Sequence, residues 1–107
     1  MEIEVTKADT FWKRLKGLLG KKSLSKGEVL WITPCHQVHM IGMKFPVSVW
    51  FLDDNFNIIK IIDNLIIGSI SPSVPNATSV LELPVNYAKE IGVTVGDCLS
   101  LISIDNN

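Results

Sequence analysis

The sequence predicts a mainly β fold: a single-domain β-sandwich or half-open barrel, with an amphipathic N-terminal helix packed on the sheet and a short second helix before the last strand. Several segments are rich in valine, isoleucine and aromatic residues and are bounded by turn-forming residues, which is typical of strands. Two other segments favour helix. A chain of 107 residues with 47% hydrophobic content can build one core, so we expect one domain over residues 1–107.

The first two predicted elements are a strand and the amphipathic helix. Residues 2–6 alternate polar and apolar side chains, which is the pattern of a half-buried strand. Asp9 or Thr10 can cap the helix that follows, and Gly20 suits its C-terminal end. Its apolar residues fall within an arc of roughly 120°: Phe11, Trp12, Leu15, Leu18 and Leu19. An apolar face of this width is typical of a helix that packs on its own domain.

Strands separated by turns are expected in the rest of the chain, together with a short helix over residues 85–91 that ends at Gly92. The predicted strands cover residues 28–33, 37–41, 46–53, 57–67, 78–83 and 97–104. Residues 68–76 contain two prolines and three serines and are predicted to form a long loop. Long loops of this kind often line binding sites.

The charge pattern limits the partners that we expect. The formal net charge of −1 gives no overall attraction to nucleic acid, so no nucleic-acid partner is expected. Seven of the ten basic residues precede residue 27, and this basic cluster could hold a phosphate, an acidic partner or a membrane surface. The apolar runs are too short for a transmembrane segment. The first five residues lack the features of a secretory signal, so a cytoplasmic location is expected.

The segment over residues 34–43 carries the most reactive side chains. Cys35, His36, His39 and Met43 have thiol, imidazole and thioether groups, which are suitable ligands for copper(I) or zinc. On a strand, however, Cys35 and His39 would lie roughly 13 Å apart, whereas the ligands of one zinc lie within about 4 Å of each other. A soft-metal site therefore requires a loop and is an alternative hypothesis. Our main expectation is that no metal is bound.

The main functional hypothesis is a non-catalytic binding or accessory module. His39, Met43 and Trp50, with the loop over residues 68–77, are expected to bound a partly apolar pocket. Aromatic and thioether walls with one polar group suit a small, partly apolar ligand. Because the sequence has neither a P-loop nor a dinucleotide-binding glycine pattern, no cofactor is expected.

A small enzyme is the alternative from a different class. Cys35 could be a nucleophile with His36 or His39 as its base, because a neighbouring imidazole lowers the pKa of a thiol. The sequence has no Gly-x-Ser-x-Gly or His-Glu-x-x-His motif, which excludes the commonest hydrolase and metalloprotease mechanisms. A domain of this length does not need a disulfide, so Cys35 and Cys98 are both expected to be reduced and buried.

Four carboxylates could perform acid–base chemistry if two of them converge: Asp53, Asp54, Glu82 and Asp97. The three aspartates also suit turns, where aspartate accepts hydrogen bonds from its own backbone. Glu82 interrupts an apolar segment, and alternation makes it face away from Leu81 and Leu83, either toward water or toward a partner. Arg14, the single arginine, could form a bidentate pair with Glu82 and lock the helix onto the sheet.

Motifs along nearly the whole chain resemble those of one family. The motifs are Arg14–Gly20 (RLKGLLG), Pro34–Cys35 followed by His39 and Met43, Pro46–Asp53 (PVSVWFLD), Val80–Pro84 (VLELP) and Gly92–Asp97 (GVTVGD). In this order they resemble the domain of unknown function 192 family, the uncharacterised protein family 0127 group. The resemblance implies a small β-sandwich or open barrel with a packed helix, and no established activity. The family usually has aspartate where this chain has Ser48, so an activity that depends on that aspartate would be missing here.

Overall fold

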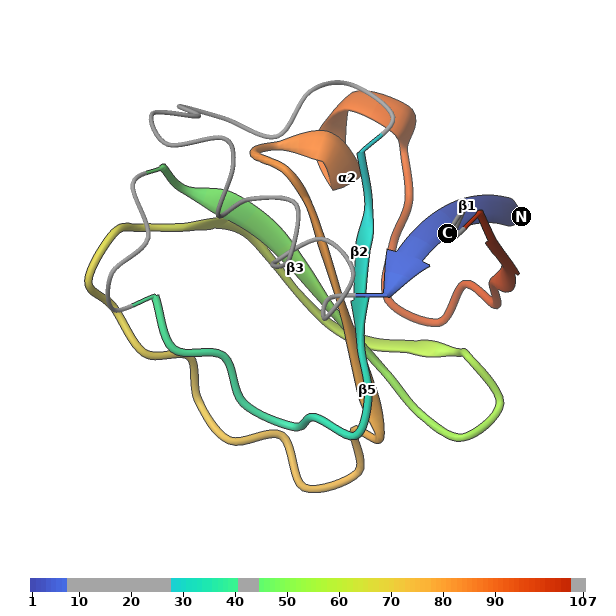
Figure 1. The fold of residues 1–107 in the computed structure, drawn as a ribbon, viewed down its shortest axis with the longest axis horizontal. Helices are drawn as coiled ribbons and strands as arrows, with labels where there is room; N and C mark the ends of the chain where they lie inside the picture. Colours follow the sequence, from blue (N-terminus) through green and yellow to red (C-terminus); the bar gives the residue numbers. More distant parts are fainter. Residues whose placement is uncertain (8–27, 41–44, 105–107) are drawn as a thin grey trace.

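A mixed β-sheet of six strands forms the centre of the protein (Figure 1). The computed structural model describes residues 1–7, 28–40 and 45–104. The strands are β1 (Glu2–Lys7), β2 (Leu30–Ile32), β3 (Val47–Leu52), β4 (Ile58–Leu65), β5 (Ser79–Pro84) and β6 (Ser100–Ser103), and the helix α2 (Tyr87–Ile91) lies between β5 and β6 in the chain. Over these ranges, no helix is long and apolar enough to cross a membrane.

The strand order in the sheet is β4-β3-β5-β2-β1-β6. β3 pairs antiparallel with β4 and β5, and β5 pairs antiparallel with β2. β1 runs parallel to both β2 and β6. β5 therefore has neighbours on both sides, and its Glu82 lies opposite Val49 of β3 and Leu30 of β2.

Two hydrophobic clusters cover the two faces of the central strands. The first core cluster contains Leu30, Val38, Met40, Phe45, Val47, Val49, Phe51, Leu65, Ala77 and Val80, and the second contains Ile3, Val5, Val29, Trp50, Leu52, Ile58, Leu81, Leu83, Ala88 and Leu99. Successive residues of β3 alternate between the clusters because the side chains of a strand point to opposite faces. All six residues of β3 are buried, as are the first five of β5. Polar side chains in these strands therefore need hydrogen-bond partners within the protein.

An aspartate in β4 anchors α2 to the sheet. Oδ1 of Asp63 accepts hydrogen bonds from the Ser48 hydroxyl at 2.6 Å and from the Ala88 N–H at 2.9 Å, and Oδ2 accepts one from the Lys89 N–H at 2.9 Å. The first N–H groups of a helix have no partner within the helix, and a negative charge is favourable beside them. Asp63 performs the role of a capping residue, since the N-cap residue Asn86 makes no side-chain capping hydrogen bond.

The prediction of a mainly β fold is confirmed, and each described strand overlaps a predicted one. The strands form one mixed sheet, and in the described part of the chain they are not divided into the two packed sheets of a sandwich. α2 lies within the helix predicted over residues 85–91. The predicted N-terminal helix, which begins at Asp9 or Thr10 and ends at Gly20, falls outside the described residues.

Two local predictions are wrong. The described part of the strand predicted over residues 37–41 makes only an isolated β-bridge, between His39 and Ile70. The physical reason is that the Val38 N–H donates to the Ser71 hydroxyl at 2.8 Å, so a side chain replaces a rung of the strand ladder. Neither cysteine is fully buried: Cys98 is exposed, because it lies just after a surface turn, and Cys35 is half-buried; both are free thiols.

The anchoring role of Asp63 can be tested by truncation. We expect Asp63→Ala to lower the free energy of unfolding by about 1–2 kcal/mol, because two helix N–H groups and the Ser48 hydroxyl lose their acceptor. Urea unfolding followed by circular dichroism measures this change. Asn64→Ala, at the next and exposed position of β4, is the matched control and should change stability by less than about 0.5 kcal/mol. Equal losses in the two variants would contradict the anchoring role.

Candidate functional site

Glu82 is a buried carboxyl group on the apolar face of the sheet that carries the first core cluster. It shares this face of β5 with Val80, and its neighbours across the sheet, Leu30 and Val49, are at most 1% exposed. Glu82 itself is 4% exposed. Its Oε2 atom has no hydrogen-bond partner among the residues that the structure describes. The prediction that Glu82 could face water is therefore wrong, because both faces of β5 are covered.

Burial determines the protonation of Glu82. Removal from water disfavours the charged form and raises the pKa of the carboxyl group to about 7. Near neutral pH the group is therefore close to the midpoint between its two forms. The neutral form can donate one hydrogen bond, whereas the ionised form only accepts.

Cys35 packs against the same core cluster. Its N–H donates to the Thr78 carbonyl at 3.1 Å, and its thiol donates to the Gln37 carbonyl at 3.2 Å. Burial is the largest cause of a raised pKa of the thiol, and the charge of Glu82 raises it further. Cys35 and Glu82 are thus electrostatic neighbours, and their surroundings disfavour the thiolate that a nucleophile requires.

His39 lies on the outer side of this region. Residues 36–40 are hydrogen-bonded to residues 69–74 by backbone groups, which places His39 beside the proline- and serine-rich loop, as the sequence predicts. Its neighbours Val38 and Met40 are buried in the first core cluster, whereas His39 is exposed. Because side chains alternate along an extended segment, the imidazole points away from the core and from Glu82.

Trp50 lies on the opposite face of the sheet. It has no exposed surface, and it belongs to the second core cluster. Its indole N–H donates to the Ser48 hydroxyl at 2.9 Å, and its ring stacks on Tyr87 with 6.3 Å between ring centroids. The structure therefore does not bring Trp50 together with His39. Met43 and Arg14, the other residues of the hypothesised pocket and ion pair, fall outside the described residues.

The predicted turn aspartates do hold turns. Oδ1 of Asp53 accepts hydrogen bonds from the N–H groups of Asn55 and Asn57, each at 2.9 Å, and the Asn57 backbone bond is the main cause of a lowered Asp53 pKa. Oδ2 of Asp97 accepts one from the Thr94 N–H at 2.9 Å. Of the four carboxylates considered from the sequence, Glu82 is the buried one, since Asp54 and Asp97 are exposed and Asp53 is intermediate.

The sequence interpretation missed the polar chain that joins Trp50, Ser48 and Asp63. The Trp50 indole donates to Ser48, and Ser48 donates to Asp63. Ser48 is completely buried, so the hydroxyl satisfies the indole N–H where no water can reach it. One signal was available: Ser48 and Asp63 are polar residues within two strands of otherwise strong β-forming character. This chain of contacts lies on the face opposite Glu82.

The histidine and cysteine side chains do not gather into a metal-binding group. Within the described ranges, the structure contains no cluster of three or more histidine, cysteine or acidic residues that could hold an ion. His36 is exposed, and its Nδ1 is hydrogen-bonded to the Ser73 hydroxyl at 3.1 Å. The described residues thus offer no observation that favours the soft-metal alternative.

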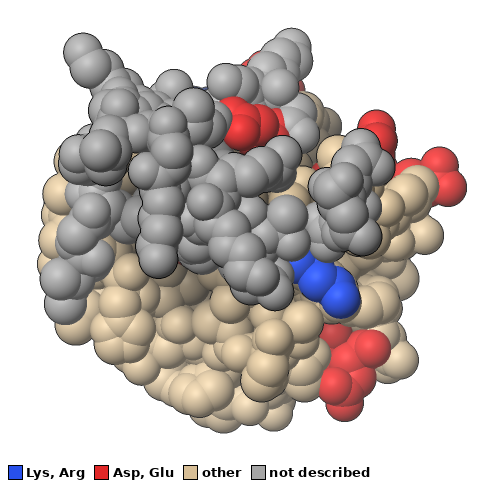
Figure 2. All heavy atoms as spheres, viewed as in Figure 1, with Lys and Arg blue, Asp and Glu red and all other residues tan. Residues whose placement is uncertain are grey.

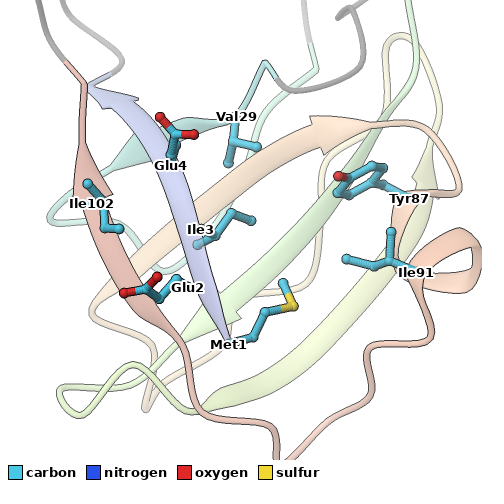
Figure 3. A pocket seen from close by; sticks show the side chains of 8 residues that line it. All are labelled: Met1, Glu2, Ile3, Glu4, Val29, Tyr87, Ile91 and Ile102. Carbon is cyan, nitrogen blue, oxygen red and sulfur yellow. The ribbon is translucent and has the colours of Figure 1, made fainter.

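A separate pocket of about 610 Å³ lies between β1, α2 and β6. Its lining residues are Met1, Glu2, Ile3, Glu4, Val29, Tyr87, Ile91 and Ile102 (Figure 3). Apolar side chains form most of this lining, and none of these residues was among the sites considered from the sequence. The pocket depends on α2 lying across the hollow from β1, which no local pattern in the chain indicates.

Comparison with known proteins places the chain in a family. The pattern of the DUF192 family, described as Uncharacterized ACR, matches residues 1–101, and no curated protein matches the chain. A protein of unknown function from Novosphingobium aromaticivorans is similar, with a TM-score of 0.67, 18% identity, and coverage of 91% of this chain and 71% of that chain. A candidate transcription regulator from Sinorhizobium meliloti is similar, with a TM-score of 0.66, 20% identity, and coverage of 91% and 78%. These structures share the fold, and because the family pattern covers nearly the whole sequence, the chain belongs to the DUF192 family.

Proposed function

We propose that this protein is a non-catalytic binding module that holds a small, partly apolar ligand through the carboxyl group of Glu82. The observation that supports the proposal is the Oε2 atom of Glu82, which is buried and has no hydrogen-bond partner in the described part of the chain. A buried polar group without a partner costs about 1–3 kcal/mol. A ligand that donates a hydrogen bond to this atom would remove that cost on binding.

The surroundings of Glu82 favour a ligand with an apolar part. Leu30 and Val49 flank the carboxyl group on neighbouring strands, and both belong to the first core cluster. Small-molecule sites combine apolar walls with a few polar groups that fix orientation. Glu82 supplies such a polar group, and Cys35 supplies a soft, weakly polar neighbour on the same face.

The chemistry of the candidate catalytic groups supports binding rather than catalysis. Burial raises the pKa of the Cys35 thiol, whereas a cysteine nucleophile needs a lowered one. His39 points away from the core. The carboxylates of Asp53 and Asp97 hold their own turns.

The pairing of Glu82 with Arg14 is the competing proposal for the same carboxyl group. A guanidinium would hold Glu82 in its ionised form and lower its pKa, whereas burial in an apolar site raises it. The two proposals therefore predict opposite effects of pH on stability, which makes them distinguishable.

Stability should fall as pH rises through the range in which Glu82 titrates. The folded-state pKa is about 7 and the ordinary value is 4.5, so between these values the folded protein binds more protons than the unfolded chain. Below about pH 4.5 the group contributes nothing; above about pH 7 the full penalty, on the order of 3 kcal/mol, is present. Urea unfolding of the wild type and of Glu82→Gln at several pH values measures this penalty. The free energy of unfolding of the variant should rise relative to that of the wild type as pH rises. The opposite slope would favour the pair with Arg14.

Ligand binding at Glu82 can be tested with small probes that combine an apolar ring with a hydrogen-bond donor. We expect benzamide to raise the melting temperature of the wild type, by roughly 5 °C at about ten times the Kd. Glu82→Gln should lose this shift, because the amide that replaces the carboxyl group is a poorer acceptor. Asp54→Asn, at an exposed turn position, is the control and should keep it. Equal shifts in the two variants would contradict the proposed site.

The non-catalytic assignment predicts slow alkylation of Cys35. With iodoacetamide near neutral pH, we expect the exposed Cys98 to react faster than Cys35, because burial raises the pKa of the Cys35 thiol. Mass spectrometry of the two cysteine-containing peptides at several pH values measures both rates in one sample. Faster labelling of Cys35 than of Cys98, with a rate that saturates below neutral pH, would favour the enzyme hypothesis.

A further inference from the structure

We propose that the pocket between β1, α2 and β6 binds a small amphipathic cation, of the arylalkylammonium class. This site is separate from Glu82, because none of its lining residues is Glu82 or a neighbour of Glu82 across the sheet. The proposal rests on three features of the pocket: its size and apolar lining, the fixed position of its aromatic wall, and the sign of the charge at its rim.

The size and lining suit a small organic molecule. The pocket volume of about 610 Å³ lies within the range of roughly 300–1,000 Å³ that is typical of ligand sites. In Figure 3 the side chains of Tyr87 and Ile91 from α2 face Met1 and Ile3 from β1 across the hollow. Met1, Ile91 and Ile102 are each at least 39% exposed, so the apolar surface can be reached from solvent. An apolar ligand group bound here would remove apolar protein surface from water, which favours binding.

The aromatic wall of the pocket is held from behind. Tyr87 stacks on the buried Trp50, whose indole donates to Ser48, and the carboxylate of Asp63 accepts the first N–H groups of α2. These contacts fix α2 and the ring of Tyr87 before any ligand arrives. A preformed wall lowers the ordering cost of binding.

The charges around the pocket decide the class of ligand. Glu2 and Glu4 are the two acidic residues among the described lining residues, and these residues include no lysine, arginine or histidine. The ammonium group of Met1, also in the lining, donates to the Cys98 carbonyl at 3.2 Å and keeps its positive charge, so the two carboxylates and this one cation leave the rim with an excess of negative charge. Figure 2 shows acidic side chains at the edge of the molecule where Figure 1 draws the N-terminal end of β1. A ligand ammonium group near the exposed carboxylates of Glu2 and Glu4 would gain attraction at the rim, while its ring lies against the apolar wall.

Three probes of similar shape and different charge test the proposal: 2-phenylethylammonium, 2-phenylethanol and 3-phenylpropionate. Titrations at about pH 7 and an ionic strength of about 0.01 M, followed by two-dimensional NMR of the backbone amides, give both the site and the Kd. We expect shifts at β1 and at residues 87–91, with the cation binding most tightly and the anion most weakly. Raising the ionic strength to about 0.15 M should weaken binding of the cation and leave binding of the alcohol unchanged, because salt screens the exposed carboxylates.

Matched variants separate the charge effect from the apolar contact. The double variant Glu2→Gln, Glu4→Gln should raise the Kd of the cation roughly fivefold and leave the Kd of the alcohol unchanged. Ile91→Ser should weaken all three probes, whereas Ile67→Ser, at an exposed position outside the pocket, should not. Since both glutamates are exposed, the double variant decides the question even if Ile91→Ser does not fold. Glu82→Gln should have no effect here, so failure of this proposal leaves the Glu82 site untouched. Shifts elsewhere, or equal binding of the three probes, would overturn it.

Discussion

The double-sided burial of β3 and β5 is the constraint on which the rest of the structure depends. Each of these strands lies inside the sheet, and each face is covered by one of the two core clusters. A polar side chain in such a strand cannot reach water and must find a partner within the protein or remain unpaired. The two strands contain three such side chains: Ser48 in β3, and Ser79 and Glu82 in β5. Ser48 is satisfied by its neighbours, whereas Ser79 and Glu82 each have an oxygen without a partner among the described residues.

Ser48, whose hydrogen bonds are satisfied, organises one face of the sheet, and Glu82, which has an unpaired oxygen, lies on the other face. Ser48 connects Trp50 to Asp63, which receives the first N–H groups of α2, and Tyr87 of that helix returns to stack on Trp50. This circuit fixes the helix that lines the pocket beside β1. On the opposite face no such circuit reaches the Oε2 atom of Glu82 within the described residues, and burial raises its pKa to about 7. The burial of both faces of β3 and β5 therefore has two consequences. On one face it fixes α2 and the ring of Tyr87, and on the other it leaves Glu82 as a titratable group.

The positions of the strands could be predicted from the sequence, whereas the burial and the contacts of their polar residues could not. Valine, isoleucine and aromatic residues located β3 and β4, because branched and aromatic side chains fit a pleated surface. The polar–apolar alternation did not predict the burial of Glu82. Such a pattern is interpreted on the assumption that one face of the strand is exposed to solvent, whereas both faces of β5 are covered. The cap of α2 comes from Asp63, more than twenty positions before the helix, so no local capping signal could reveal it. Ser71 interrupts the ladder at Val38 by a contact between segments far apart in the chain, which is equally invisible in a local pattern.

Ser48, where the resemblance to the family implies an aspartate, has a clear physical role in this structure. The Ser48 hydroxyl is completely buried and lies 2.6 Å from a carboxylate oxygen of Asp63, whose side chain is partly exposed. An aspartate at position 48 would place a second carboxylate against Asp63, and two carboxylates at this distance cannot both stay ionised. Serine removes the conflict because its hydroxyl accepts from the Trp50 indole and donates to Asp63 at the same time. The carboxylate that faces α2 thus comes from β4 in this chain, and position 48 provides the hydroxyl that joins it to the core.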